Sequence, residues 1–197
     1  MGKKAIFLFL LIALPILVFL FLKTFGDNQY TIPVYYEEGL GDSLATPCLE
    51  RKSEQYVVQS LDLPKGSIHI VQLESQEGPV LKTRLEELER VQDVFYDVPQ
   101  IKLTTFINSA SLNSQDIDDY NGRINFYASF WGVKSLAPED WIALKTCVLA
   151  MKEIDNRVVL IDRMGRIRGY YNIFERDETD RLIAELRILK ANLDKNE

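Results

Sequence analysis

The chain has few side chains that could do thiol or imidazole chemistry, with two cysteines and one histidine among its 197 residues. Cys48 and Cys147 lie about a hundred residues apart. They could form a structural disulfide, remain two separately buried thiols, or act together as a catalytic pair. We expect the disulfide, because the N-terminal segment predicts export and oxidised thiols persist outside the cytoplasm. Closing so long a loop contributes up to about 4.7 kcal/mol in the loop-entropy treatment.

The single histidine, His69, lies between Ile68 and Ile70 in a predicted strand. No cysteine or second histidine is near it in sequence, so we expect a packed structural side chain and not a metal ligand. Four oxygen-bearing side chains could instead meet in the fold: Glu74, Glu77, Asp155 and Asn156. Such ligands suit Ca²⁺ or Mg²⁺. Carboxylates scattered through an acidic protein are usually solvated, which is the simpler expectation.

The overall composition excludes several classes of function. A formal net charge of −6 and a pI near 5.0 leave no basic footprint, so we expect no nucleic-acid partner. One histidine and two cysteines exclude a metal site that needs several soft ligands, and most catalytic templates built on histidine. The length suits one domain of ordinary size with an N-terminal extension, and such a domain buries a core without a metal.

Residues 5–22 form an apolar segment of eighteen residues without a charge, between Lys4 and Lys23. This length is close to what spans the roughly 30 Å hydrocarbon core as a helix. A secretory signal peptide has a shorter apolar region and a small-x-small cleavage site, and neither fits; a buried soluble helix is the alternative. We expect an uncleaved single-span anchor in the cell inner membrane, with residues 5–22 in contact with lipid. Residues 1–4 would stay cytoplasmic, and the C-terminal domain would face the periplasm.

Residues 23–54 mix Gly, Pro, Tyr and acidic residues without a period, which indicates a tether and an irregular lead-in. A folded domain is expected at residues 55–197. Apolar alternation, short apolar runs and turn residues predict its strands at 56–60, 67–73, 101–107, 141–144, 158–161 and 167–171.

Three helices are predicted in the same domain. The first begins at Pro79, with Leu81, Leu85 and Leu88 on its apolar face and the charged run 82–90 as its solvated face. The second runs from Asn113 or Ser114 through Tyr120. The third follows Asp177 as N-cap and buries Leu182, Ile183, Leu186 and Leu189. Alternating strands and helices predict an α/β fold with a central mixed sheet flanked by helices.

One region of the predicted domain is rich in aromatic residues: Phe126, Tyr127, Phe130, Trp131 and Trp141. We expect these side chains to pack at the edge of the core. An exposed patch that docks a protein partner is the alternative, because aromatic residues are favoured at interfaces.

Two stretches carry a resemblance to a known family. Residues 157–171 read RVVLIDRMGRIRGYY, a buried strand, a Met-Gly turn and a second strand, and residues 66–71 read GSIHIV. A strand, tight turn, strand and closing helix is how thioredoxin-like domains end. Over about residues 56–189 the chain resembles the SCO1/SenC family, membrane-anchored thioredoxin-like proteins associated with copper delivery to cytochrome c oxidase. The resemblance implies a thioredoxin-like fold in the exported domain.

The chain departs from this family at the copper site. The family places a C-x-x-x-C motif between the GSIHIV-type strand and the first helix, and a later histidine completes the ligands. Here Asn156 stands in place of the histidine, and the loop consists of Ser75, Gln76, Glu77, Gly78 and Pro79. Oxygen and amide groups match soft Cu(I) poorly, and dithiol exchange requires thiolates. The resemblance therefore implies a degenerate family site, without copper and without enzymatic activity.

These observations predict a non-enzymatic binding or assembly factor with a protein partner in the envelope, related to respiratory oxidase biogenesis. The alternative is a thiol-disulfide or copper-handling protein that uses Cys48 or Cys147 from unusual positions. A low thiol pKa would favour that alternative.

Overall fold

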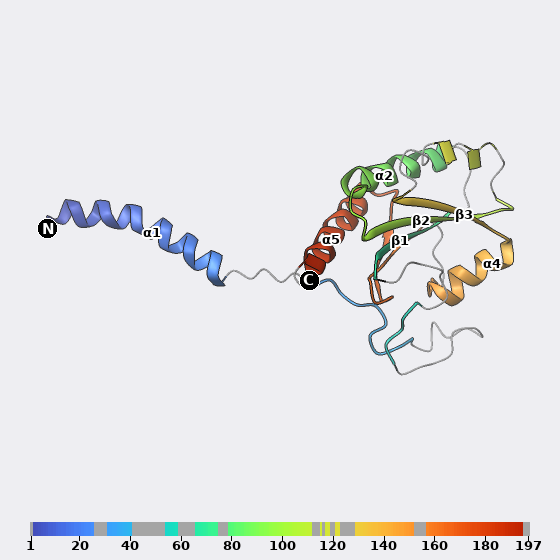
Figure 1. Ribbon diagram of the computed structural model, residues 1–197, viewed down its shortest axis with the longest axis horizontal. Coiled ribbons are helices and arrows are strands. Elements are labelled where there is room, and N and C mark those ends of the chain that lie inside the picture. The colour runs from blue at the N-terminus through green and yellow to red at the C-terminus, as the bar shows by residue number, and fades with distance from the viewer. Residues whose placement is uncertain are drawn as a thin grey trace. The chain divides into compact units, whose positions relative to one another are not determined.

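The computed structural model describes residues 2–25, 31–40, 54–58, 66–74, 79–111, 115, 117–118, 121–122, 129–151 and 157–194. The chain divides into two compact units, Met1–Thr31 and Ile32–Glu197. The first unit contains helix α1 (Lys3–Phe25) (Figure 1). Within the described ranges, no helix has both the length and the apolar character of a membrane span.

The second unit begins ahead of the expected domain start at residue 55. Its described strands form a five-stranded mixed sheet in the order β3-β2-β1-β4-β5. The strands are β1 (Ile68–Glu74), β2 (Ile101–Asn108), β3 (Trp131–Leu136), β4 (Arg157–Ile161) and β5 (Ile167–Asn172). β1, β2 and β3 are parallel, whereas β4 runs antiparallel to β1 and β5 antiparallel to β4. Every residue of the central strand β1 is buried, including the polar side chains of His69, Gln72 and Glu74.

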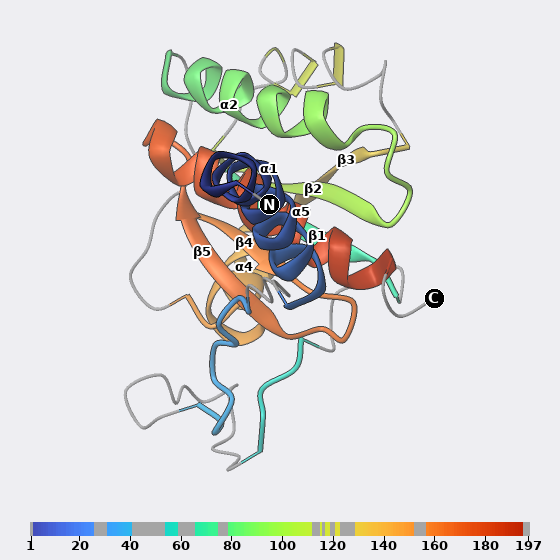
Figure 2. The same ribbon diagram turned by 90° about the vertical axis from the view of Figure 1, so that its left-hand side faces the viewer.

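Helices cover both faces of this sheet (Figures 1 and 2). Helices α2 (Pro79–Phe95) and α5 (Arg176–Asp194) pack on one face, where Leu88, Ile70 and Leu186 share a core. Helix α4 (Pro138–Ala143), continued by the π-helix η2 (Leu144–Val148), covers the other. The sequence β1-α2-β2 followed by β4-β5-α5 defines a thioredoxin-like α/β fold. The predicted mixed sheet flanked by helices is confirmed.

At the edges of the fold one prediction is wrong and one strand was not predicted. Residues 141–144 are helical and not a strand, because Pro138 occupies the first turn of α4 together with Glu139 and Asp140. Proline and acidic residues at this position start a helix. Strand β3 was not predicted, since Gly132 and exposed polar residues interrupt the apolar pattern of this edge strand.

Three further boundaries differ from the expectations. Helix α5 starts at Arg176, so Asp177 lies in its first turn and is not the N-cap. In the predicted strand 56–60, the described residues make isolated backbone hydrogen bonds instead of a ladder, and residues 59–60 lie outside the described residues. Of the predicted helix that ends at Tyr120, Gln115, Ile117 and Asp118 are helical, and the rest lies outside the described ranges.

A segment without regular structure, residues 31–40 and 54–58, lies against the β4-β5 hairpin; we call it the strap. The Tyr35 amide donates to the Ile167 carbonyl at 2.9 Å, and the Val58 amide donates to the Gly165 carbonyl at 2.8 Å. The Arg168 guanidinium donates to the carbonyl of Ile32. The hairpin that carries the family resemblance therefore holds the strap in place.

The backbone of Gly165 makes a close contact with the strap. Its φ of +80° lies in the left-handed region that favours glycine. A Cβ atom at this position would lie 2.8 Å from Val57 Cγ1 and 3.1 Å from the Val58 carbonyl oxygen. The Met164-Gly165 turn thus needs glycine for its backbone conformation and for the contact with the strap.

Candidate functional site

The predicted degenerate site is the connection between β1 and α2. β1 ends at Glu74 and α2 begins at Pro79. Ser75, Gln76, Glu77 and Gly78 lie outside the described residues, as do Asn156 and the side chain of Pro79. The structure describes the residues around this connection, at the end of β1 and along α2.

A buried ion pair joins the end of β1 to α2. Arg84 Nη1 donates to Glu74 Oε1, and neither side chain is exposed. The Arg84 guanidinium also lies 4.5 Å from the centre of the Phe174 ring, in the connection between β5 and α5. Glu74 was expected at the solvated surface or as an ion ligand. It is buried instead, because α2 places a cation over the end of β1.

Hydrogen bonds extend this ion pair across the sheet. Gln72 Nε2 donates to Glu74 Oε2 at 3.0 Å, and Thr105 Oγ1 donates to Gln72 Oε1 at 2.8 Å. Trp131 Nε1 in turn donates to Thr105 Oγ1 at 2.9 Å. Gln72 and Thr105 are direct neighbours in the β1-β2 register. The buried polar network therefore links α2 to β1, β2 and β3, while Nε and Nη2 of Arg84 have no hydrogen-bond partner among the described residues.

The burial of Arg84 was not predicted, because the charged run 82–90 indicated the solvated face of the helix. The spacing contained the signal, because Arg84 lies three residues after Leu81 and four before Leu88, on the apolar stripe itself. Leu85 and Leu88 are buried as predicted, and Arg84 is buried among them. A charged residue on the apolar stripe of a helix predicts a buried partner, here Glu74.

The described residues give no metal centre. Among them, no group of three or more His, Cys, Asp and Glu side chains could hold an ion. His69 is 4% exposed in β1, so the predicted packing of this side chain is confirmed. Of the four oxygen-bearing candidates only Glu74 is described; Glu77, Asp155 and Asn156 lie outside the described ranges.

Cys147 lies in the π-helix η2, on the face of the sheet that α4 covers. Its Sγ is 3.4 Å from the Thr146 hydroxyl. Cys48 lies outside the described residues, so the predicted Cys48–Cys147 disulfide stays a prediction. The strap residues that flank position 48 in sequence reach this region, as the tyrosine contacts show.

Three tyrosine hydroxyls donate to the carbonyls that follow each other at the end of η2. Tyr56 donates to Cys147 at 3.2 Å and to Val148 at 2.8 Å. Tyr170 donates to the Leu149 carbonyl at 2.7 Å, and Tyr36 to the Ala150 carbonyl at 3.4 Å. These bonds occupy carbonyls that a helix end leaves without intrahelical partners. We call Tyr36, Tyr56 and Tyr170 the tyrosine clasp.

Burial keeps the hydroxyls of Tyr56 and Tyr170 neutral. Burial, with a smaller contribution from the neighbouring Tyr36, raises the pKa of Tyr56 to about 12. Burial also raises the pKa of Tyr170 well above its ordinary value, helped by its hydrogen bond with Tyr36. The rings meet edge to face, with centroids 6.3 Å apart for Tyr36 and Tyr56. The clasp was not predicted, because strap and π-helix are far apart in sequence and neither has a periodic pattern.

The aromatic region packs inside the domain, as expected. Phe130, Trp131 and Trp141 are 2%, 1% and 8% exposed. The alternative of an exposed docking patch is wrong for these three side chains. Phe126 and Tyr127 lie outside the described residues.

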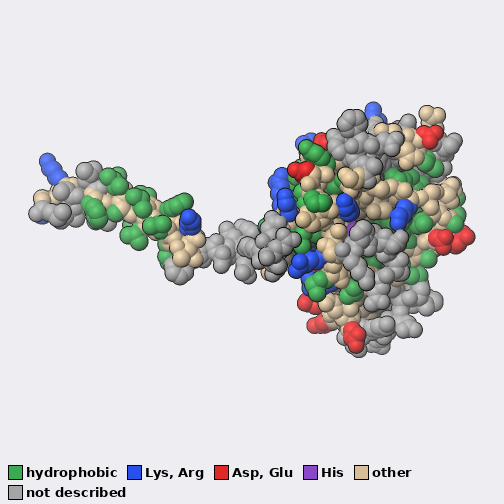
Figure 3. Space-filling model, viewed as in Figure 1, with side chains coloured by type: hydrophobic (Ala, Val, Ile, Leu, Met, Phe, Trp, Pro, Cys, Tyr) green, Lys and Arg blue, Asp and Glu red, His purple; other side chains and the backbone are tan. Residues whose placement is uncertain are grey.

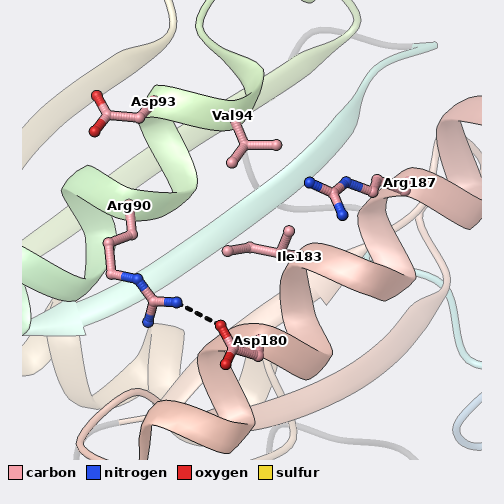
Figure 4. A pocket seen from close by; sticks show the side chains of 6 residues that line it. All are labelled: Arg90, Asp93, Val94, Asp180, Ile183 and Arg187. Carbon is pink, nitrogen blue, oxygen red and sulfur yellow. Dashed lines mark hydrogen bonds and ion pairs between the residues drawn. The ribbon is translucent and has the colours of Figure 1, made fainter.

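A shallow hollow of about 440 Å³ lies between α2 and α5 (Figure 4). Its charged lining is balanced, with Arg90 and Arg187 against Asp93 and Asp180. Arg90 donates to both Glu87 and Asp180, and these hydrogen bonds raise the pKa of its guanidinium. Ion pairs as exposed as these contribute little to the free energy of unfolding, about 0–1 kcal/mol each. The residues that line this hollow include no histidine, cysteine or hydroxyl side chain that could act as a nucleophile.

Neither a family model nor a curated protein matches this chain. Solved structures similar to it include a SCO1/SenC family lipoprotein from Bacillus anthracis strain Ames, at 14% identity over 64% of this chain and 83% of that chain, with a TM-score of 0.48. BsSco, a member of the Sco family of cytochrome c oxidase assembly proteins, is 13% identical over 64% and 81%, with a TM-score of 0.45. A thioredoxin family thiol:disulfide interchange protein from Chlorobium tepidum is 16% identical over 64% and 80%, with a TM-score of 0.45.

Proposed function

We propose that this chain is a membrane-anchored, thioredoxin-like binding or assembly factor of the cell envelope. It acts by holding a protein partner and not by thiol or copper chemistry. Its role belongs to the biogenesis of a respiratory oxidase, the process with which the resembled SCO1/SenC family is associated. Residues 5–22 anchor it in the inner membrane, and the domain that follows faces the periplasm.

The observation that carries this proposal is the connection between β1 and α2. With β1 ending at Glu74 and α2 starting at Pro79, the connection reads Ser-Gln-Glu-Gly and contains no cysteine. Thiol-disulfide exchange requires a thiolate that attacks, and Cu(I) prefers sulfur ligands. The position at which the resembled family carries out its chemistry therefore lacks the atoms that this chemistry needs.

The buried polar network supports a structural role for the residues beside this connection. Both carboxylate oxygens of Glu74 accept hydrogen bonds, from Arg84 and from Gln72. A general acid or base has to reach its substrate to transfer a proton. An enclosed carboxylate that is paired with a guanidinium holds β1 and α2 together instead.

The anchor is supported by the N-terminal sequence. Helix α1 has 23 residues, and positions 5–22 carry no charge. Its described apolar side chains are exposed, for example Phe9 at 72% and Leu17 at 65%. Exposed apolar side chains along the length of a helix favour burial in lipid. In isolated membranes washed with alkaline carbonate, the full chain should remain in the pellet; release into the supernatant would contradict the anchor.

Deletion and complementation in the source organism test the proposed role. Cells that lack the chain should assemble less respiratory oxidase, measured from haem absorbance of isolated membranes. The wild-type chain should restore the oxidase, and so should the Cys48→Ser/Cys147→Ser double variant at matched protein level, because the thiols do no chemistry. Undiminished oxidase in the deleted cells would contradict the respiratory role. Failure of the double variant alone, at matched level, would favour thiol or copper chemistry.

A further inference from the structure

A second hollow, of about 140 Å³, lies where the β4-β5 turn meets the end of α5. Its charged lining consists of Arg163, Arg166 and Arg168 against Asp162. Three arginines and one aspartate give a formal charge of +2, in a chain whose net charge is −6. The carbonyl end of α5 carries a partial negative charge of about half a unit, which offsets only part of this. Positive charge is thus concentrated at one hollow of an acidic protein, and Figure 3 shows Lys and Arg side chains along the α5 side of the second unit.

The guanidinium of Arg168 is held rigidly at this hollow. Its Nη1 donates to Asp162 Oδ2 at 3.2 Å, and its Nη2 donates to the carbonyl of Ile32. The residue is 9% exposed, and its Nε has no hydrogen-bond partner among the described residues. A buried N–H of a cation without an acceptor is costly. Arg168 lines the hollow, so its guanidinium lies beside any acceptor that enters it.

Two further arginines complete the lining. Arg166 Nε binds Asp162 at 2.7 Å, so the single aspartate is already shared between two guanidinium groups. Arg163 is exposed and, in the described part of the chain, makes no hydrogen bond or ion pair. The hollow therefore has a fixed donor inside and a cation at its rim that is available to a ligand.

We propose that this hollow binds a phosphate-type oxyanion. The planar fork of arginine matches the oxygens of a phosphate group. A water molecule occupies roughly 30 Å³ of the liquid, so the hollow holds several waters or one small tetrahedral anion. Apolar side chains beside the arginines can contact the ester part of an organic phosphate: Ile68, Met164, Leu189 and Leu193. The source is a soluble phosphate or a phospholipid headgroup, and the assignment of the anion site stands independently of the proposed function.

NMR of the full chain in maltoside micelles tests this site, with the Nε–Hε signals of the arginines as the readout. Inorganic phosphate is titrated against chloride at constant ionic strength. In a second arm the micelles are doped with phosphatidylglycerol or with uncharged diacylglycerol. The Arg168 signal should shift saturably with phosphate or phosphatidylglycerol and not with chloride or diacylglycerol. A response to inorganic phosphate alone assigns a soluble anion, and a response to phosphatidylglycerol alone assigns the headgroup.

Charge reversal of Arg163, at the rim of the hollow, is compared with the same change at a distant arginine. Arg163→Glu should weaken the binding by about tenfold or more, because it replaces a charge-assisted contact with repulsion. Arg176→Glu makes the same change at an exposed residue of the opposite end of α5 and should leave the affinity unchanged. Equal melting temperatures exclude unfolding as the cause. No saturable shift with either probe, or equal affinity of the Arg163→Glu variant and the wild type, would overturn the proposal.

Discussion

The Arg84 guanidinium and the Glu74 carboxylate form an ion pair in which neither side chain is exposed. Removal of one partner from such a pair leaves an uncompensated buried charge, at a cost of about 3–5 kcal/mol. We therefore expect Arg84→Met to lower the free energy of unfolding by about this amount. The Glu74→Leu/Arg84→Met double variant should lose less than the sum of the single variants, because both desolvated charges are removed together.

Urea denaturation of the wild type, the two single variants and the double variant measures this coupling. Lys82→Met, on the exposed face of the same helix, serves as the control and should change stability by less than about 0.5 kcal/mol. An Arg84→Met variant as stable as the wild type would show that the pair does not hold β1 to α2.

Gly165→Ala should destabilise the contact between hairpin and strap. The new Cβ would lie 2.8 Å from Val57 Cγ1, on a backbone with a φ of +80°. The left-handed conformation alone costs a non-glycine residue about 1–2 kcal/mol, and the close contact adds to it. Gly132→Ala is the matched control, because nothing lies within 4 Å of the Cβ it would create. Equal melting temperatures of the Gly165→Ala and Gly132→Ala variants would contradict a stabilising contact between Gly165 and the strap.

The stability of the domain should fall as the pH rises from the unfolded-state pKa of Tyr56 to its folded-state pKa. The pKa of Tyr56 is about 12 in the folded protein, against an ordinary value of 10.0. Between these values the unfolded chain releases the hydroxyl proton and the folded chain keeps it, so the unfolded state binds fewer protons and stability decreases with pH. The contribution is complete below the unfolded pKa and lost above the folded one.

Tyr56→Phe should make this alkaline decline shallower without abolishing it, since the pKa of Tyr170 is also raised by burial. It should also lower stability at neutral pH by about 1 kcal/mol, through the lost hydrogen bonds to Cys147 and Val148. Urea denaturation across this pH range measures both effects. A Tyr56→Phe slope identical to that of the wild type would count against the clasp.

The predicted Cys48–Cys147 disulfide has a direct chemical test. Thiol counting on the full chain, denatured without reductant, should find no titratable thiol, and prior reduction should release two. Reduction or Cys48→Ser should lower the free energy of unfolding by several kcal/mol, up to about 4.7 kcal/mol. Two titratable thiols in the unreduced protein would rule out the disulfide.

The sequence predicted the central elements because their patterns are local. The alternating Ile68 and Ile70 of β1, the Met164-Gly165 turn and the leucine stripe of α5 each lie within a short stretch of sequence, and all three occur in the structure. These elements predicted a central mixed sheet flanked by helices, and the family resemblance of residues 66–71 and 157–171 implied the thioredoxin-like form of the fold. Residues 141–144 were predicted as a strand because Trp141 and Ile142 are common in strands. The Pro138-Glu139-Asp140 start signal instead indicates the helix that the structure contains.

The features that the sequence did not predict depend on contacts between distant segments. Arg84 and Glu74 each resembled a surface charge until α2 and β1 were placed together. The strap has no periodic apolar pattern in its sequence. Its conformation is held by contacts with Gly165, Arg168 and Tyr170, which belong to a hairpin more than a hundred residues later in the chain. The residue types of the predicted degenerate site follow directly from the sequence. Ser75 to Gly78 themselves lie outside the described residues.

The central claim is that the chain has lost the copper and thiol chemistry of the family it resembles. Titration of the full chain with Cu(I), in competition with a chelator and beside Cys48→Ser and Cys147→Ser variants, tests it most directly. We predict that neither the wild type nor a variant withdraws Cu(I) from the chelator. Tight stoichiometric binding by the wild type that is lost in either variant would contradict the claim and place copper on relocated cysteine ligands.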